Sequence, residues 1–227
     1  MSAPETIAIV PVKSLEAAKS RLADVLAPEA RWRLVLAMLG DVLTAVMAVP
    51  AVTRTIVVTC DAEVAAAARG HGAEIVHESQ PISLNGALRT ALHVGCARPD
   101  TRCLILPADV PLATSDEIAA LLTPPMETPH RVTIAPSHDG GGTNALVLMD
   151  HDVMGPSFGP DSFRRHLDLA EALHLNPRVV RLPGLGFDVD TPDDLRRLCR
   201  IERYRWLEGE WLHEPQASPS LRAHQSA

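Results

Sequence analysis

The sequence is poor in aromatic residues and has no long apolar run. Phe, Trp and Tyr make up 3% of the 227 residues, whereas hydrophobic residues make up 46%, so Ala, Val, Leu and Ile must build the core. No apolar run approaches the roughly 20 residues of a membrane-spanning helix. The first expected strand begins so near the N-terminus that it leaves no room for a signal peptide. The sequence therefore predicts a cytoplasmic protein without a membrane partner.

The chain also lacks a basic excess and a cysteine motif. Its formal net charge is −7, which argues against a nucleic-acid partner, because nucleic-acid binders usually carry a basic face. The cysteines show no CxxC spacing and no clustering with histidine, a pattern typical of reduced, structural thiols. They are Cys60, Cys96, Cys103 and Cys199.

What the chain does contain is a regular alternation of strand-like and helix-like segments. Continuous apolar strands separated by helices predict a mostly parallel sheet covered on both faces, in one α/β/α sandwich. We expect one domain over residues 1–213 and a disordered tail over 214–227, where no periodicity remains. The expected strands are residues 7–11, 55–59, 74–76, 103–106, 132–135, 144–148 and 179–182. The expected helices are residues 28–49, 62–69, 85–97, 115–122, 162–173 and 192–206.

Two carboxylate turns stand at the ends of expected strands. Asp109 follows an apolar run and precedes a proline, and Asp188 and Asp190 precede Thr191–Pro192. The carboxyl edge of a parallel sheet is where such folds bind ligands, and alternation along a strand points Asp188 and Asp190 the same way. Three such oxygen donors suit Mg²⁺. The alternative is that Asp190 only caps the helix that follows.

A basic loop follows the first strand. It holds Lys13, Lys19 and Arg21 but no glycine, so the dinucleotide-binding fingerprint is absent. Cations at the ligand-binding edge can neutralise a triphosphate and stabilise a departing pyrophosphate. The alternative is a solvated basic loop.

Two further segments are suited to binding an anion. Gly140–Gly142 allow close approach of backbone N–H groups, and Thr143 adds a hydroxyl. Gly159 and Ser162 precede and open a helix, whose N-terminus attracts anions. The alternatives are a plain hairpin turn and an N-cap formed by Asp161 or Ser162.

Three other polar residues lie near these segments. Asn85, at an expected helix start, could contact the base or ribose of a nucleotide, or serve only as an N-cap. His138 and His166 could suggest a general base. We do not assign that role, because a phosphate-monoester nucleophile is already ionised.

Taken together, six segments of the chain resemble the CofC/FbiD family, the guanylyltransferases of coenzyme F-420 (deazaflavin) biosynthesis. The resemblance covers nearly the whole chain except the tail and implies a Rossmann-like GT-A nucleotidyltransferase fold, related to the molybdenum-cofactor guanylyltransferases but without their glycine-rich signature. Ser83 stands where the family more usually has glycine. The segments are residues 11–22, 84–88, 106–111, 140–146, 158–166 and 188–195.

The resemblance also implies a reaction and roles for the site residues. GMP would pass from GTP to the phosphate of phosphoenolpyruvate, 2-phospho-L-lactate or 3-phospho-D-glycerate, with release of pyrophosphate. The labile product would then pass to the transferase that joins it to the deazaflavin. Asp109, Asp188 and Asp190 would hold Mg²⁺. Thr143, Gly159 and Ser162 would hold the acceptor, and Lys13, Lys19, Arg21 and Asn85 would bind the nucleotide.

Two other functions fit parts of the pattern. A GT-A glycosyltransferase also uses an Asp-x-Asp metal site, although that pair normally lies mid-chain and here lies near the C-terminus. A non-catalytic nucleotide-binding regulatory subunit could share the fold, but it would be expected to have lost an Asp or a loop cation, and this chain retains them all.

Overall fold

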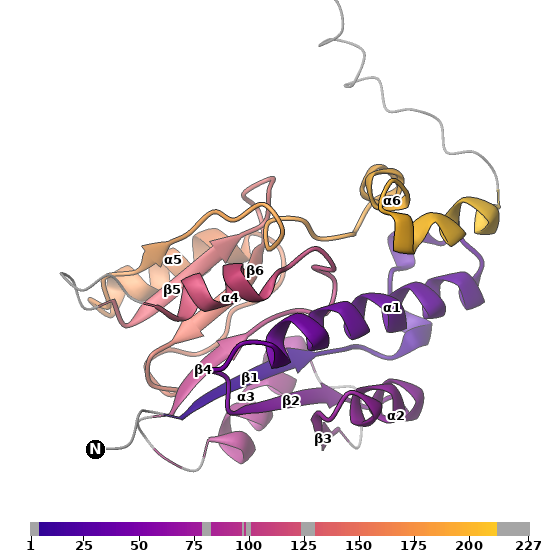
Figure 1. Cartoon of the computed structure of the whole chain (residues 1–227). Helices are drawn as coiled ribbons and strands as arrows, with labels where there is room; N and C mark the ends of the chain where they lie inside the picture. Colours follow the sequence, from indigo (N-terminus) through magenta and orange to yellow (C-terminus); the bar gives the residue numbers. More distant parts are fainter. Residues whose placement is uncertain (1–4, 79–82, 97, 99–100, 124–129, 213–227) are drawn as a thin grey trace, which may run out of the picture.

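The computed structural model describes residues 5–78, 83–96, 98, 101–123 and 130–212, so the expected tail lies outside the described residues. Seven strands form one sheet in the order β3-β2-β1-β4-β6-β5-β7 (Figure 1). All neighbouring pairs are parallel except those of β6, which runs antiparallel to β4 and β5. The prediction of a mostly parallel sheet is confirmed. The strands are β1 (Thr6–Pro11), β2 (Arg54–Thr59), β3 (Glu74–His77), β4 (Arg102–Ile105), β5 (Val132–Pro136), β6 (Thr143–Leu148) and β7 (Arg178–Val179).

Helices cover both faces of the sheet, as the alternation predicts (Figure 1). In β1, Ala8 and Val10 pack into the core beneath α1, α2, α4 and α6, whereas Ile7 and Ile9 pack beneath α3 and α5. This division follows from the two-residue side-chain period of a strand. The helices are α1 (Pro28–Met47), α2 (Ala62–Gly70), α3 (Leu84–Gly95), α4 (Ser115–Leu122), α5 (Ser162–Ala172) and α6 (Pro192–Cys199), with 3₁₀ helices η1 (Leu15–Ala17), η2 (Ser20–Leu22) and η3 (Glu202–Glu210).

The C-terminal helix is shorter than the sequence predicts. Instead of running to about residue 206, α6 ends at Cys199, Ile201 is extended, and η3 follows. In one continuous helix Tyr204 would lie about 2.5 turns after Leu195, and therefore on the opposite face. The break lets both residues enter the core, where Tyr204 is 1% exposed.

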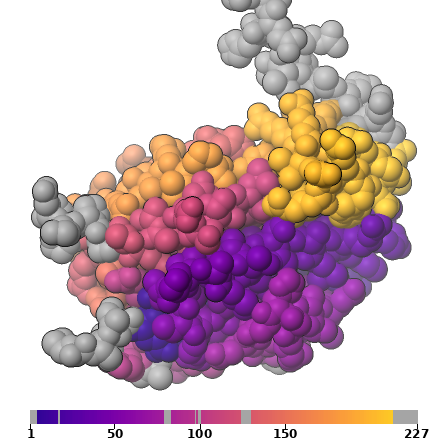
Figure 2. Space-filling view, viewed as in Figure 1, coloured from indigo at the N-terminus to yellow at the C-terminus, as the bar shows by residue number. Residues whose placement is uncertain are grey.

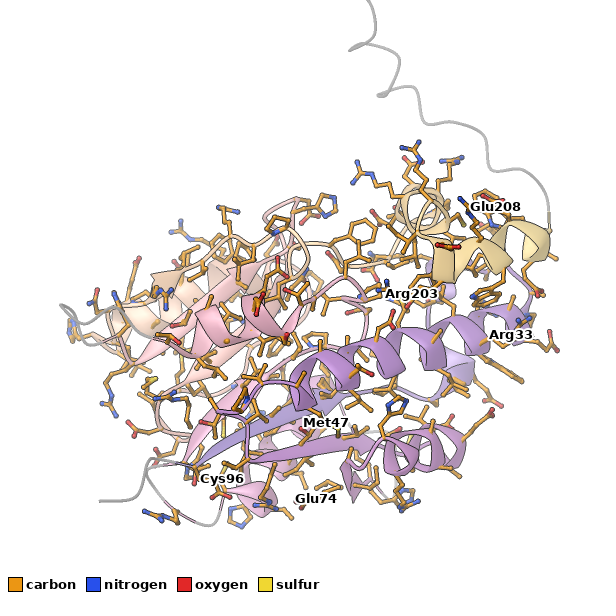
Figure 3. All side chains as sticks on the ribbon, in the orientation of Figure 1. Arg33, Met47, Glu74, Cys96, Arg203 and Glu208 are labelled. Atoms are coloured by element: carbon orange, nitrogen blue, oxygen red, sulfur yellow. The ribbon has the colours of Figure 1, made fainter. Side chains whose placement is uncertain are left out.

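The segment η3 closes against α1. The Tyr204 hydroxyl and the Arg203 guanidinium both donate to Asp41 of α1, at 2.6 and 2.7 Å. Figure 2 shows the C-terminal part of the chain (yellow) against the N-terminal part, and Figure 3 shows Arg203 at this junction. None of the helices in the described ranges is long and apolar enough to cross a membrane.

The last strand is also shorter than expected, because β7 has only two residues, although the Val180 N–H still donates to the carbonyl of Ile134. The described cysteines are free thiols, and the sulfurs of Cys96 and Cys103 lie 3.0 Å apart in a thiol hydrogen bond.

The topology determines where a site can form. β1 and β4 are parallel neighbours, and β6 runs the opposite way beside β4. The first residue of β6 therefore lies at the same sheet edge as the last residues of β1 and β4, which brings Thr143 to the edge where the loop of Asp109 leaves the sheet.

Candidate functional site

A cavity of about 710 Å³ opens at this edge, a size typical of small-ligand sites. It is lined by the loops after β1 and β4, the glycine turn before β6, the start of α5 and the segment before α6. Nine of the ten predicted site residues line it, and only Asn85 does not. The nine are Lys13, Lys19, Arg21, Asp109, Thr143, Gly159, Ser162, Asp188 and Asp190.

Lys19 lies between two of the predicted carboxylates. Its Nζ is 2.8 Å from Asp109 Oδ2 and 2.9 Å from Asp190 Oδ1. Burial by itself would lower the pKa of Lys19, but the two carboxylates raise that pKa above its usual value, so the side chain is charged. The solvated-loop alternative is wrong for Lys19, whose side chain is 9% exposed, whereas Lys13 and Arg21 are exposed.

Asp190 does not cap the following helix. The N-cap of α6 is Thr191, whose hydroxyl accepts from the N–H of Asp194. The carboxylate of Asp190 instead faces Lys19 and Arg21, at 2.9 and 3.4 Å. The capping alternative is therefore wrong.

Asp188 is the most enclosed of the three carboxylates. It accepts a hydrogen bond from Asn144 Nδ2 at 3.1 Å, and its side chain is 22% exposed. Burial raises its pKa, and the negative charges of Asp109 and Asp190 raise that pKa further. The three carboxylates thus lie close enough to repel one another, and a cation between them would relieve this repulsion.

Hard carboxylate oxygens at one cavity wall suit a divalent cation such as Mg²⁺, so the chemistry of these donors fits the predicted metal. Within the part of the chain that the structure describes, no group of three His, Cys, Asp or Glu residues is arranged as a metal-binding cluster. The ammonium of Lys19 lies between two of the three candidate ligands. The metal role of the three Asp residues stays a prediction.

A residue that the sequence reasoning missed holds the segment before Asp188. The Glu117 carboxylate of α4 accepts from the N–H groups of Gly184 and Leu185, at 2.8 and 3.1 Å. Asn144 Nδ2 donates to the Leu185 carbonyl, and the Val189 N–H donates to the carbonyl of Asp109. The sequence signal at Glu117 was its capping box with Thr114, which indicates a helix start but does not predict this long-range contact.

Contrary to the prediction from the sequence, the glycine turn at residues 140–142 does not offer its backbone N–H groups to an anion. The N–H of Gly140 donates to the Ser137 carbonyl and that of Gly142 to the Ser137 hydroxyl. The N–H of Gly141 donates to Asp139, and that of Thr143 to Ser162 Oγ. All four amides are occupied within the protein, because the tight turn directs them inward. The groups left to face a ligand are hydroxyls.

Those hydroxyls belong to Thr143 and Ser162, which are 4% and 2% exposed and line the cavity. Ser162 Oγ accepts from the Thr143 N–H at 2.9 Å, and Thr143 Oγ1 lies 3.0 Å from His166 Nδ1. Asp161 occupies the N-cap position of α5, as one alternative predicts, but its side chain makes no cap hydrogen bond. The N-cap alternative is wrong for Ser162, whose hydroxyl is engaged with β6.

Asn85 makes a contact with a distant loop that neither alternative predicts. The N-cap of α3 is Ser83, whose hydroxyl accepts from the N–H of Gly86, so the capping alternative is wrong. The Asn85 amide instead accepts from the N–H of Phe158 at 2.7 Å and donates to its carbonyl at 3.0 Å. Asn85 thus holds the loop that enters α5, and a contact with a nucleotide stays a prediction.

Known proteins resemble this chain over most of its length. The family model "Guanylyl transferase CofC like" matches residues 6–201. A "Phosphoenolpyruvate guanylyltransferase" of Sphaerobacter thermophilus is 43% identical over 86% of this chain and 92% of its own, and one of Nocardia farcinica is 45% identical over 86% and 85%. A "2-phospho-L-lactate guanylyltransferase" of Methanothermobacter thermautotrophicus is 35% identical over 96% and 92%.

Solved structures agree on the fold. A nucleotidyl transferase from Methanothermobacter thermautotrophicus superposes with a TM-score of 0.63 at 16% identity, over 90% of this chain and all of the other. CMP:2-keto-3-deoxy-manno-octonic acid synthetase, solved with CTP, gives 0.59 at 14% identity, over 91% and 99%. At such identities the likeness extends to the GT-A-like nucleotidyltransferase fold and no further.

Proposed function

The chain belongs to the family of CofC-like guanylyltransferases, and from this premise we propose that it transfers GMP from GTP to a small three-carbon phospho-acid. The observation that carries the proposal is the cavity at the sheet edge. Carboxylates, cations and two buried hydroxyl groups all line it. Family membership favours guanylyl transfer over a glycosyltransferase or a regulatory subunit.

Phosphoenolpyruvate is the first candidate acceptor, because it is named for the two bacterial relatives at 43% and 45% identity. 2-Phospho-L-lactate and 3-phospho-D-glycerate are the alternatives. An oxygen of the acceptor's phosphate forms a bond to the α-phosphorus of GTP. The bond from that phosphorus to the β-phosphate oxygen breaks, and pyrophosphate leaves with the electron pair. The attacking oxygen is already ionised, so no general base is required.

The residues of the cavity divide between the two substrates. Lys13 and Arg21 are exposed at the rim and would meet the triphosphate, and Lys19 would neutralise charge beside Asp109 and Asp190. Thr143 and Ser162 would donate to the phosphate or carboxylate of the acceptor, with Gly159 beside them. This arrangement catalyses by positioning and by charge neutralisation.

Asp109, Asp188 and Asp190 would hold Mg²⁺, which when bound draws charge from the phosphates and orients the leaving pyrophosphate. We further propose that the reaction takes place in the cytoplasm as a step of coenzyme F-420 biosynthesis. The product joins a phosphate to a guanylyl group and is labile, so it would be handed to the transferase that attaches it to the deazaflavin.

A coupled assay tests this function. The protein is incubated with GTP, Mg²⁺, the deazaflavin transferase with its acceptor, and each of the three acids in turn. Product with one acid supports the proposal and identifies the substrate. No product with any acid, from a transferase shown to be active, would refute it.

Matched variants test the site within the same assay. Asp190→Asn should lower turnover at least about 100-fold, because it removes charge from the cavity wall. Asp152→Asn changes an exposed carboxylate outside the cavity and should leave turnover unchanged. Equal rates in the two variants would contradict the assignment of Asp190.

A further inference from the structure

His166 is a buried side chain to which the proposed chemistry assigns no step. It lies on α5 with no exposed surface, and its ring meets the Phe158 ring edge-on at 4.9 Å between centroids. Nε2 accepts from the N–H of Ser157 at 2.9 Å, and Nδ1 lies 3.0 Å from Thr143 Oγ1. Both ring nitrogens therefore contact segments that line the acceptor side of the cavity or lead into it.

The contact with Ser157 determines the tautomer of the ring. A backbone N–H can only donate, so Nε2 must carry the lone pair. A neutral imidazole has one ring proton, which is therefore on Nδ1 and donated to Thr143 Oγ1. Burial, followed by the charge of Arg165, lowers the pKa of His166 to about 4, against a smaller opposing effect of the Ser162 carbonyl. The ring is consequently neutral at physiological pH.

The tautomer in turn determines what the hydroxyl of Thr143 can do. Its oxygen accepts from Nδ1–H, so its own hydrogen must point elsewhere. The oxygen of Ser162 likewise accepts from the Thr143 N–H. For the hydrogens of these two hydroxyls, the structure describes no protein acceptor among the residues it covers, and both side chains line the cavity. Each is thus held as a donor toward a ligand.

We propose that His166 is a positioning residue that makes the Thr143 hydroxyl a committed hydrogen-bond donor to an anionic oxygen of the acceptor. The inference rests on the proposed function and adds a residue to it. No proton is transferred, since the ring stays neutral and donates the same Nδ1–H throughout. A histidine that merely filled the core would stabilise the fold but would not determine acceptor affinity through Thr143.

Variants at the two positions separate these roles. His166→Gln can still accept from Ser157 through its amide oxygen but loses the donor at the Nδ1 position. His166→Asn can place an amide N–H near that position. We expect His166→Gln and Thr143→Val to raise the KM for the acceptor acid about 10- to 100-fold, the effect of losing one hydrogen bond to a charged group. His166→Asn and Thr143→Ser should stay within about threefold, and the KM for GTP should not change in any of the four.

The double variant supplies the decisive comparison. If His166 acts through the Thr143 hydroxyl, Thr143→Val with His166→Gln should be no worse than Thr143→Val alone. Multiplied effects, or equal losses in His166→Gln and His166→Asn, would overturn the proposal. Thr143→Val is nearly isosteric, so it keeps the test valid if a His166 variant fails to fold.

A spectroscopic measurement tests the hydrogen bonds without turnover. In protein labelled with ¹⁵N at histidine, the imidazole resonances of His166 should report the Nδ1–H tautomer between pH 5.5 and 8. An Nε2–H tautomer or a mixture would overturn the inference. Absence of turnover with every acid in the wild type would instead refute the proposed function, while the tautomer spectrum would still decide the hydrogen-bond pattern around His166.

Discussion

The ion pairs of Lys19 make a quantitative prediction about stability. Lys19→Met removes the ammonium between Asp109 and Asp190 and leaves an apolar side chain of similar length. Asp109 then loses its ion-pair partner, Asp190 keeps only the exposed Arg21, and both carboxylates remain near that of Asp188. We expect the free energy of unfolding to fall.

The size of the loss follows from distance and exposure. At about 3 Å and an effective dielectric constant near 20, each pair contributes roughly 5–6 kcal/mol of gross attraction, most of which the cost of desolvation cancels. Removing one partner of a fully buried pair costs about 3–5 kcal/mol. The side chains of Asp109 and Asp190 are 33% and 40% exposed, so solvent screens them in part. We therefore expect a loss of about 2 kcal/mol.

Urea unfolding in a metal-free buffer with a chelator measures this loss. Lys13→Met is the matched control, because Lys13 is exposed and no described carboxylate pairs with it. The control should stay within about 0.5 kcal/mol of the wild type. The reasoning would be refuted if Lys19→Met also stayed within 0.5 kcal/mol, or if Lys13→Met cost as much.

Three further measurements test other parts of the structure. Gly184→Ala places a Cβ 2.1 Å from the Leu112 carbonyl oxygen, so urea unfolding should show a loss of about 2–3 kcal/mol. The Cβ added by Gly155→Ala would meet no atom within 4 Å, so this control should cost under about 0.5 kcal/mol. Equal losses of stability in the two variants would contradict the close packing at Gly184. Asp188→Asn removes a carboxylate whose pKa is raised by burial, so turnover should fall at least about 100-fold with stability unchanged or slightly higher, and a loss of over about 1 kcal/mol would count against this. The pKa of His166 is about 4 in the folded protein against its usual 6.5. Its contribution to the free energy of unfolding is therefore complete above pH 6.5 and is lost as pH falls toward 4. Between pH 7 and 4.5 the free energy of unfolding of the wild type, measured with urea, should fall by about 2–3 kcal/mol more than that of His166→Gln. A difference between the two proteins that does not change with pH would refute this.

Local patterns in the sequence were enough to predict most of the elements and the fold class. Of the elements in the described part of the chain, the apolar runs and the spacing of core positions predict six of the seven strands and five of the six α-helices to within a few residues, because period and turn chemistry act over short distances. The prediction of the last helix was wrong beyond Cys199. The sequence pattern there does not show that Tyr204 must turn toward the core.

The same local reasoning placed nine of the ten predicted residues at one cavity. Strand direction carries Asp109 to the carboxyl edge. The prediction that Asp188 and Asp190 follow directly from the end of a strand was wrong, because β7 ends at Val179. The hydrogen bond from the Val189 N–H to the Asp109 carbonyl holds that irregular segment at the edge instead. Helix and turn signals bring Thr143 and Ser162 to that edge.

Only the tertiary structure decided which groups pair there. Lys19 and Asp190 are 171 positions apart in the chain, Asn85 and Phe158 are 73 apart, and Thr143 and His166 are 23 apart. A sequence pattern gives the type and approximate place of each side chain. A hydrogen bond requires two atoms within about 3 Å at a suitable angle, and that condition depends on how distant segments pack.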